Sequence, residues 1–230
     1  MTLLTDYNKV YPAMEGRNNL FRDILILTIF GIAFGYIEGA AAHYLRVYLY
    51  PTGFGNTLKI DLHSFLIEIG REFSTLVVLW CVAMLTRGSF SIKFSNFVFI
   101  FAIWDIVYYV ALYIFEKWPT CLLDWDVLFL IPIPWFAPVI VPITISLIGI
   151  IGCFVVRFIH AGKEKIRAGF LTSILLWSAL ILWLVSFLRH SPSEHFPAYY
   201  DWELFFHGIF LAIAGFVNLI LVNKGGLKQK

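Results

Sequence analysis

Residues 97–115 read FVFIFAIWDIVYYVALYIF, and this stretch decides the fold class. It holds one charged residue, Asp105, in a run long enough to cross the bilayer's hydrocarbon core, which is about 30 Å thick and needs about 20 helical residues. Five other stretches share this length and apolar character. The six predicted spans are Ile24–Tyr44, Ser64–Leu85, Phe97–Phe115, Trp135–Val156, Phe170–Leu188 and Leu204–Val222.

The composition agrees with a membrane protein. Hydrophobic residues make up 60% of the 230 residues and charged residues 14%, whereas a soluble domain carries roughly 25% charged residues. The mean hydropathy is +0.81. We therefore expect an all-α, polytopic integral membrane helical bundle of the cell membrane, which contacts lipid and no nucleic acid.

Lysine and arginine are distributed unequally between the two sides of this bundle. Twelve lie on the side that holds both chain ends, and four lie on the other side: Arg46, Lys59, Lys117 and Arg189. Since basic residues in short loops favour the cytoplasm, the distribution predicts that both ends are cytoplasmic. The expected organisation is a cytoplasmic segment 1–23, a six-span domain 24–222 and a cytoplasmic tail 223–230.

An alternative interpretation makes the start of the chain a signal peptide. Basic residues precede the apolar run, and Ala40-Ala41-Ala42 resembles a cleavage site. Cleavage after Ala42 would remove Glu38 and leave five spans. The long basic region, together with Tyr36 and Glu38 shortly before the cut, argues against this interpretation.

Four carboxylates lie deeper than loops would place them: Glu38, Glu68, Glu72 and Asp105. A carboxylate at the centre of a bilayer costs at least about 2.5 kcal/mol, so such residues normally face the bundle interior and have partners. These acids are either functional or structural pairs that fix helix register. Three consecutive spans contribute them at similar depth, which favours function.

The spacing suggests partners for these acids. Glu68 and Arg71 are three apart and share a helix face, so Arg71 would neutralise acids of the second span. Tyr108 lies one turn from Asp105 and can donate a hydrogen bond to it. The small residues 39–42 would let a neighbouring helix approach Glu38 closely.

The connection 116–134 is too apolar for a free loop and too interrupted for a span. We expect an interfacial or re-entrant segment on the non-cytoplasmic side. Asp124 and Asp126 would point in opposite directions within it, one of them as a cap or hydrated acid. Pro138 and Pro142 predict a kink in the fourth span.

The first functional hypothesis is a metal-dependent enzyme acting on a membrane-delivered substrate. A divalent metal (Fe, Mn, Mg or Zn) would be the cofactor that suits carboxylates with one or two histidines. His207 enters this set because it shares a helix face with Glu203. The expected metal ligands are Glu38, Glu68, Glu72, Asp105, His43 and His207, and the expected catalytic residues are Glu38, Glu72, Asp105 and Tyr108.

Two other functions remain open. The same acids would serve a proton- or cation-coupled transporter of a small solute, in which case six spans without repeats would favour a homo-oligomer. Alternatively, the chain is a non-catalytic subunit of a larger membrane complex. No GxGxxG, Walker or HExxH motif is present, which disfavours a nucleotide-driven pump and a zincin-type protease.

Overall fold

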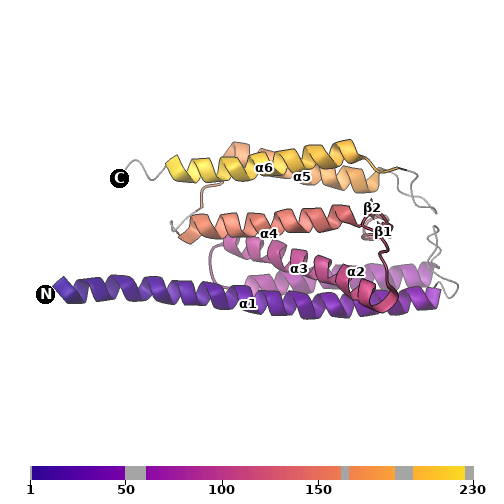
Figure 1. The fold of residues 1–230 in the computed structure, drawn as a ribbon, viewed down its shortest axis with the longest axis horizontal. Coiled ribbons are helices and arrows are strands. Elements are labelled where there is room, and N and C mark those ends of the chain that lie inside the picture. The colour runs from indigo at the N-terminus through magenta and orange to yellow at the C-terminus, as the bar shows by residue number, and fades with distance from the viewer. Residues whose placement is uncertain (1, 50–60, 162–165, 190–198, 226–230) are drawn as a thin grey trace.

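The computed structural model describes residues 2–49, 61–161, 166–189 and 199–225, and helices dominate them (Figure 1). A two-stranded hairpin lies between the third and fourth helices. In chain order the elements are α1 (Thr2–Leu49), α2 (Leu62–Leu85), α3 (Phe90–Glu116), β1 (Trp125–Val127), β2 (Phe136–Pro138), α4 (Ile140–Ala161), α5 (Phe170–Leu188) and α6 (Trp202–Gly225).

Five helices are long and apolar enough to cross a membrane, which identifies the chain as a multi-pass membrane protein. The apolar segments are Phe21–Tyr48, Phe90–Glu116, Ile140–His160, Phe170–Leu188 and Trp202–Lys224. The remaining predicted span, Ser64–Leu85, lies in α2 and is more highly charged than the other five. Helix α2 carries Glu68, Arg71 and Glu72 in its first half. Helix α1 begins at Thr2 and so includes residues 2–23, which were expected to precede the first span.

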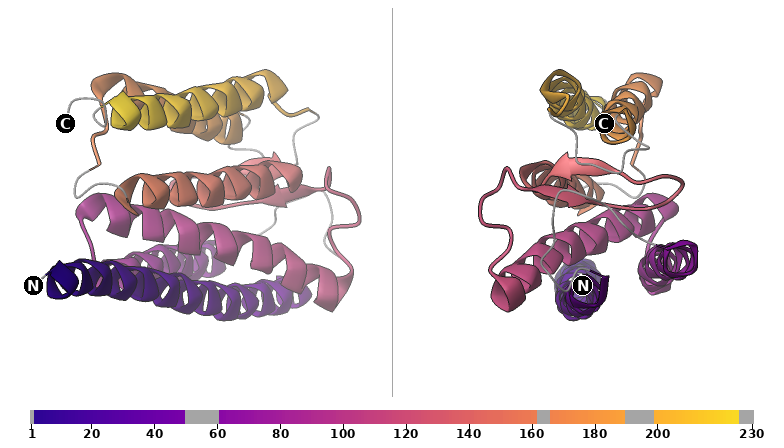
Figure 2. Two further views of the ribbon diagram at one scale, coloured as in Figure 1. Left: turned by 60° about the vertical axis from the view of Figure 1, so that its left-hand side comes forward. Right: turned by 90° about the vertical axis from the view of Figure 1, so that its right-hand side faces the viewer.

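The helices run side by side with α3 near the middle. Helix α3 packs against α1, α2 and α4, while α5 pairs with α6 and α4 contacts α6. The start of α1 and the end of α6 lie at one end of this bundle, and the β1–β2 hairpin lies at the opposite end (Figures 1 and 2).

The close contact between α1 and α3 depends on glycine. A Cβ atom on Gly35 would lie 2.7 Å from the Trp104 carbonyl oxygen, and one on Gly39 would lie 2.6 Å from the Ala111 Cβ. Only hydrogen fits at these positions, so the two backbones approach closely. The prediction that a helix packs on the small residues after Glu38 is confirmed, and α3 is that helix.

The hairpin replaces the expected start of the fourth span. Asp126 pairs with Ala137 in antiparallel register, and β2 contacts α4 and α5. The predicted span from Trp135 was therefore wrong by five residues, because α4 begins at Ile140. The predicted proline kink was wrong as well. Pro138 lies in β2, and Pro142 lies in the first turn of α4, where the missing N–H has no intrahelical acceptor.

Apolar side chains form two buried clusters. One joins the hairpin, α4, α5 and α6 around residues such as Trp183 and Phe187. The other joins α1, α2, α3 and α4 around residues such as Leu79 and Trp104. The polar cavity described next is lined by both Phe187 and Trp104, so it lies where the two clusters meet.

Candidate functional site

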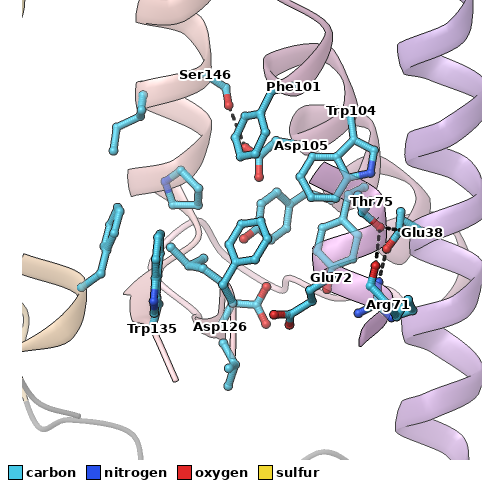
Figure 3. A pocket seen from close by; sticks show the side chains of 18 residues that line it. Glu38, Arg71, Glu72, Thr75, Phe101, Trp104, Asp105, Asp126, Trp135 and Ser146 are labelled. Carbon is cyan, nitrogen blue, oxygen red and sulfur yellow. Dashed lines mark hydrogen bonds and ion pairs between the residues drawn. The ribbon is translucent and has the colours of Figure 1, made fainter. Parts of the chain in front are cut away.

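A cavity at the hairpin end of the bundle contains about 800 Å³ of empty space, part of it open to the outside. Its walls come from α1, α2, α3, the hairpin, α4 and α5, and they combine acidic, hydroxyl and aromatic side chains (Figure 3). The lining residues are Glu38, Arg71, Glu72, Thr75, Phe101, Trp104, Asp105, Tyr108, Tyr109, Asp126, Val127, Leu128, Phe129, Trp135, Pro142, Ile145, Ser146 and Phe187.

One edge of the cavity is an ion-pair network between α1 and α2. Arg71 donates to the Glu38 carboxylate and, through Nε, to Glu68 Oε2 at 2.8 Å. Thr75 donates to the second Glu38 oxygen at 2.7 Å. Glu38 and Glu68 are buried, so Arg71 supplies the positive charge that their burial requires. The expectation that Arg71 neutralises an acid of the second span is confirmed for Glu68.

Glu72 lies one turn from this network and has a different partner. Its Oε2 accepts a hydrogen bond of 2.8 Å from the Leu130 backbone N–H, in the loop between the two strands. The residue is 8% exposed. It forms no ion pair within the part of the chain that the structure describes. Glu72 therefore attaches the hairpin loop to α2, and its carboxyl group lines the cavity.

Asp105 faces the cavity from the middle of α3. Ser146 of α4 donates a hydrogen bond of 2.8 Å to its Oδ2. Asp105, like Glu72, forms no ion pair among the described residues. Figure 3 shows the Glu72, Asp105 and Asp126 carboxyl groups turned into the cavity, whereas Glu38 lies against Arg71 and Thr75.

Asp126 connects the hairpin to α1. Its Oδ1 accepts a hydrogen bond of 3.1 Å from Arg46 Nη2. The Arg46 guanidinium also lies 3.6 Å from Glu116 Oε2 and 3.9 Å from the centre of the Trp118 ring. Burial raises the pKa of Asp126, and the charge of Arg46 opposes that rise. This contact fixes the hairpin wall of the cavity through a neutralised pair.

Asp124 has a separate structural role in the same segment. It accepts backbone hydrogen bonds from Thr120 at 2.6 Å and Cys121 at 3.1 Å, and a third from the Thr120 hydroxyl at 2.8 Å. Partial burial would raise its pKa, but these hydrogen bonds outweigh burial and lower it. We expected one of the two aspartates to be a helix N-cap, but no helix begins at Asp124, which accepts its hydrogen bonds from a turn that precedes it.

The structure brings some of the predicted site residues together. Glu38, Glu72, Asp105 and Tyr108 all line the cavity, whereas Glu68 lies behind Arg71. The two histidines lie elsewhere. His43 Nδ1 lies 3.4 Å from Glu116, and His207 is exposed on α6 with Nδ1 2.6 Å from the Glu203 carbonyl oxygen.

The expected metal centre has no support in this geometry. In the described residues, no three His, Cys, Asp or Glu side chains gather closely enough to hold a metal ion. Two facts explain this. Arg71 occupies Glu38 and Glu68, and His207 is on a helix whose residues do not line the cavity.

Sequence reasoning missed the partners that shape the site. Thr75 had a usable signal, because it lies four residues after Arg71 on the same helix face. Ser146 and Arg46 had none, since their acids are 41 and 80 residues away. The aromatic wall was also missed, because aromatic residues occur throughout this chain.

Comparisons with protein-family models, with curated proteins and with solved structures found no match to this chain. The function is therefore inferred from the chemistry of the cavity. The decisive feature is that Glu72 and Asp105, on different helices, line one space and form no ion pair with any residue that the structure describes.

Proposed function

We propose that this protein is a cation-coupled transporter of a small solute, located in the cell membrane. Its cavity would open on the non-cytoplasmic side, and Glu72 and Asp105 would exchange protons or cations there. The supporting observation is that both acids line one cavity, are surrounded by apolar rings and form no ion pair among the described residues.

The Glu72 and Asp105 carboxyl groups need their charge compensated. A carboxylate removed from water needs a proton, a cation or several hydrogen bonds to be stable. Among the described residues, Glu72 accepts one hydrogen bond, from the Leu130 backbone N–H, and Asp105 accepts one, from the Ser146 hydroxyl. These single donors leave a demand for positive charge that an entering cation or proton would meet.

In the proposed topology both chain ends lie in the cytoplasm and six helices span the membrane. These are the five apolar helices and α2. The 24 residues of α2 extend about 36 Å at 1.5 Å per residue, which is enough to cross the hydrocarbon core. Its charged residues do not oppose this assignment. Glu68 and Glu72 are buried inside the protein, and Arg71 pairs with two acids.

The segment between α3 and α4 completes the cavity in this proposal. We propose that it re-enters the outer leaflet, because Phe136 and Ala137 of β2 are fully buried against helices. Non-helical backbone at membrane depth is tolerated where protein surrounds it or where it lines a cavity. The hairpin does both, since Asp126 and Val127 line the cavity.

The metal-dependent enzyme is the less favoured function. A site for a divalent ion needs several converging oxygen or nitrogen ligands, and among the described residues no group of three is found. In a transporter, Tyr108 would have no catalytic role and would be a hydrogen-bond donor at the cavity wall.

Transport can be tested in proteoliposomes that contain a trapped pH indicator. Amines, amino acids, sugars and organic acids would be added outside, one class at a time, and the internal pH recorded. We expect one class to change the internal pH, and Glu72→Gln and Asp105→Asn to abolish the change. Glu203→Gln, an exposed acid on α6, is the matched control. The assay is repeated with a Na⁺ gradient and a trapped Na⁺ indicator, because coupling to a cation other than the proton leaves the pH unchanged. If no class changes either the internal pH or the internal Na⁺, the proposed function is wrong.

A further inference from the structure

We infer that the ligand of this cavity is an organic ammonium ion carrying alkyl groups. The inference rests on the proposed function, since it names the solute class for the same site. Three features of the described residues lead to it: more acidic than basic side chains line the cavity, they form no metal-binding group, and aromatic rings make up much of the wall.

The charge of the lining residues favours a cation. Four carboxylates line the cavity, together with one cationic side chain, Arg71. Arg71 pairs with Glu38, and Arg46 pairs with Asp126 from behind. After these pairs are counted, Glu72 and Asp105 remain without a cationic partner among the described residues. In the ionised form they repel an anionic ligand and attract a cation.

The arrangement of these acids favours an organic cation over a bare metal ion. Magnesium and calcium need about six or more oxygen ligands at short, defined distances. The described residues contain no group of three acids or histidines that could supply even half of them. An alkylammonium ion has no such requirement, because its charge is spread over carbon-bearing groups and needs only nearby negative potential.

Aromatic rings occupy the rest of the cavity wall. The centroids of Phe101 and Trp104 are 5.2 Å apart, and those of Phe129 and Trp135 are 5.4 Å apart. Phe129 joins the two pairs, since its centroid is 6.3 Å from that of Phe101. Ring faces attract ammonium groups, and tryptophan attracts them most strongly. Acids and rings on one cavity form the combination that recognises alkylated ammonium ions.

The order of side chains along the cavity wall suggests how such a ligand would lie. Apolar substituents would lie against Trp135 and Phe187, whose rings stack at 5.8 Å. The ammonium group would lie toward Asp105 and Glu72.

Choline and its uncharged isostere 3,3-dimethylbutan-1-ol test this inference, since they share a shape and differ in charge. Binding would be measured by calorimetry on the full chain in detergent micelles. We expect choline to bind, the alcohol to bind at least about tenfold more weakly, and Na⁺ and Mg²⁺ to compete poorly. Asp105→Asn and Trp104→Leu should each weaken choline binding about tenfold.

Matched controls separate loss of the ligand from loss of the fold. Glu203→Gln and Trp177→Leu change an exposed acid and an exposed tryptophan, and they should bind choline as the original chain does. Every variant must also elute as a single species in size-exclusion chromatography. Asp105→Glu, which keeps the charge, should recover part of the affinity lost in Asp105→Asn.

Two results would overturn the inference. One is equal binding of choline and the alcohol, and the other is no choline binding at all. In either case the proteoliposome assay distinguishes the two proposals. If another solute class changes the internal pH or the internal Na⁺ through Glu72 and Asp105, only the ammonium assignment is wrong. If no class does, the proposed function fails as well.

Discussion

Arg71 pairs with two buried carboxylates, Glu38 and Glu68, from two different helices. Removing one partner of a buried pair typically costs about 3–5 kcal/mol, because the remaining charge is left uncompensated. The Arg71 side chain is 32% exposed, so solvent reduces that cost. The residue is therefore a structural centre of the site and a sensitive position for mutation.

We predict that Arg71→Gln lowers the free energy of unfolding by about 2–3 kcal/mol. The double variant Arg71→Gln/Glu38→Gln should lose less than the sum of the two single variants, because it removes both charges together. Reversible unfolding in mixed detergent micelles would measure these values. Strict additivity of the two single losses would contradict the ion pair.

Asp124 gives a prediction about pH. Its pKa in the folded protein is lower than the ordinary value of 3.8, so the ionised carboxylate stabilises the loop. That stability is present above pH 3.8 and is lost as the pH falls through the lower folded-state pKa. In Asp124→Ala, hydrogen exchange of the Thr120 and Cys121 amides should be about fivefold faster at neutral pH. Unchanged exchange of both amides would show that the carboxylate does not hold them.

At the residue scale, the sequence predicts contacts between side chains of one helix but not contacts between side chains of different helices. The pairing of Glu68 with Arg71 follows from a spacing of three residues. The bond between Ser146 and Asp105 joins two helices, and no local pattern encodes it. His207 was assigned to the site from its spacing to Glu203 alone. That spacing places both residues on one helix face but does not determine whether the face points toward the cavity, and His207 is exposed.

At the element scale, α1 and α3 depend on close glycine contacts. We predict that Gly39→Ala destabilises the protein by about 1–3 kcal/mol, because its new methyl group would overlap Ala111. Gly70→Ala is the matched control. A Cβ at Gly70 meets nothing within 4 Å, so helix propensity alone should stabilise that variant by about 0.5–1 kcal/mol. Equal effects of the two substitutions in the unfolding assay would contradict the packing.

The helices were predictable because apolar length is a local property, but the hairpin was not. Residues 125–138 are as apolar as a span, and strand pairing across eight intervening residues leaves no periodic signal. The fourth helix was consequently predicted to start too early. The backbone of Leu130 illustrates the same limit, since its contact with Glu72 joins residues 58 apart.

At the scale of the whole molecule, orientation is the testable property. Cys121 is exposed in the segment between α3 and the hairpin. In a variant lacking Cys81 and Cys153, a membrane-impermeant maleimide should label Cys121 in intact cells. A cysteine introduced at exposed Ser89, at the other end of α3, should react only after the cells are opened. The reverse pattern would place the cavity on the cytoplasmic side.

The charge bias of the loops predicted this orientation, and five apolar helices support a membrane location. The cavity itself was not predictable as a shape, because five helices and a hairpin each contribute a part of its wall. What sequence did provide was the depth of Glu38, Glu72 and Asp105, which proved to line one space.

The central claim is that Glu72 and Asp105 carry exchangeable protons or cations in one cavity. Infrared difference spectroscopy during a pH step tests it directly, because protonated carboxyl groups have a separate carbonyl band. We predict a pH-dependent band in the original protein that is reduced in Glu72→Gln and in Asp105→Asn and is unchanged in Glu203→Gln. The same band in all four proteins would contradict the claim.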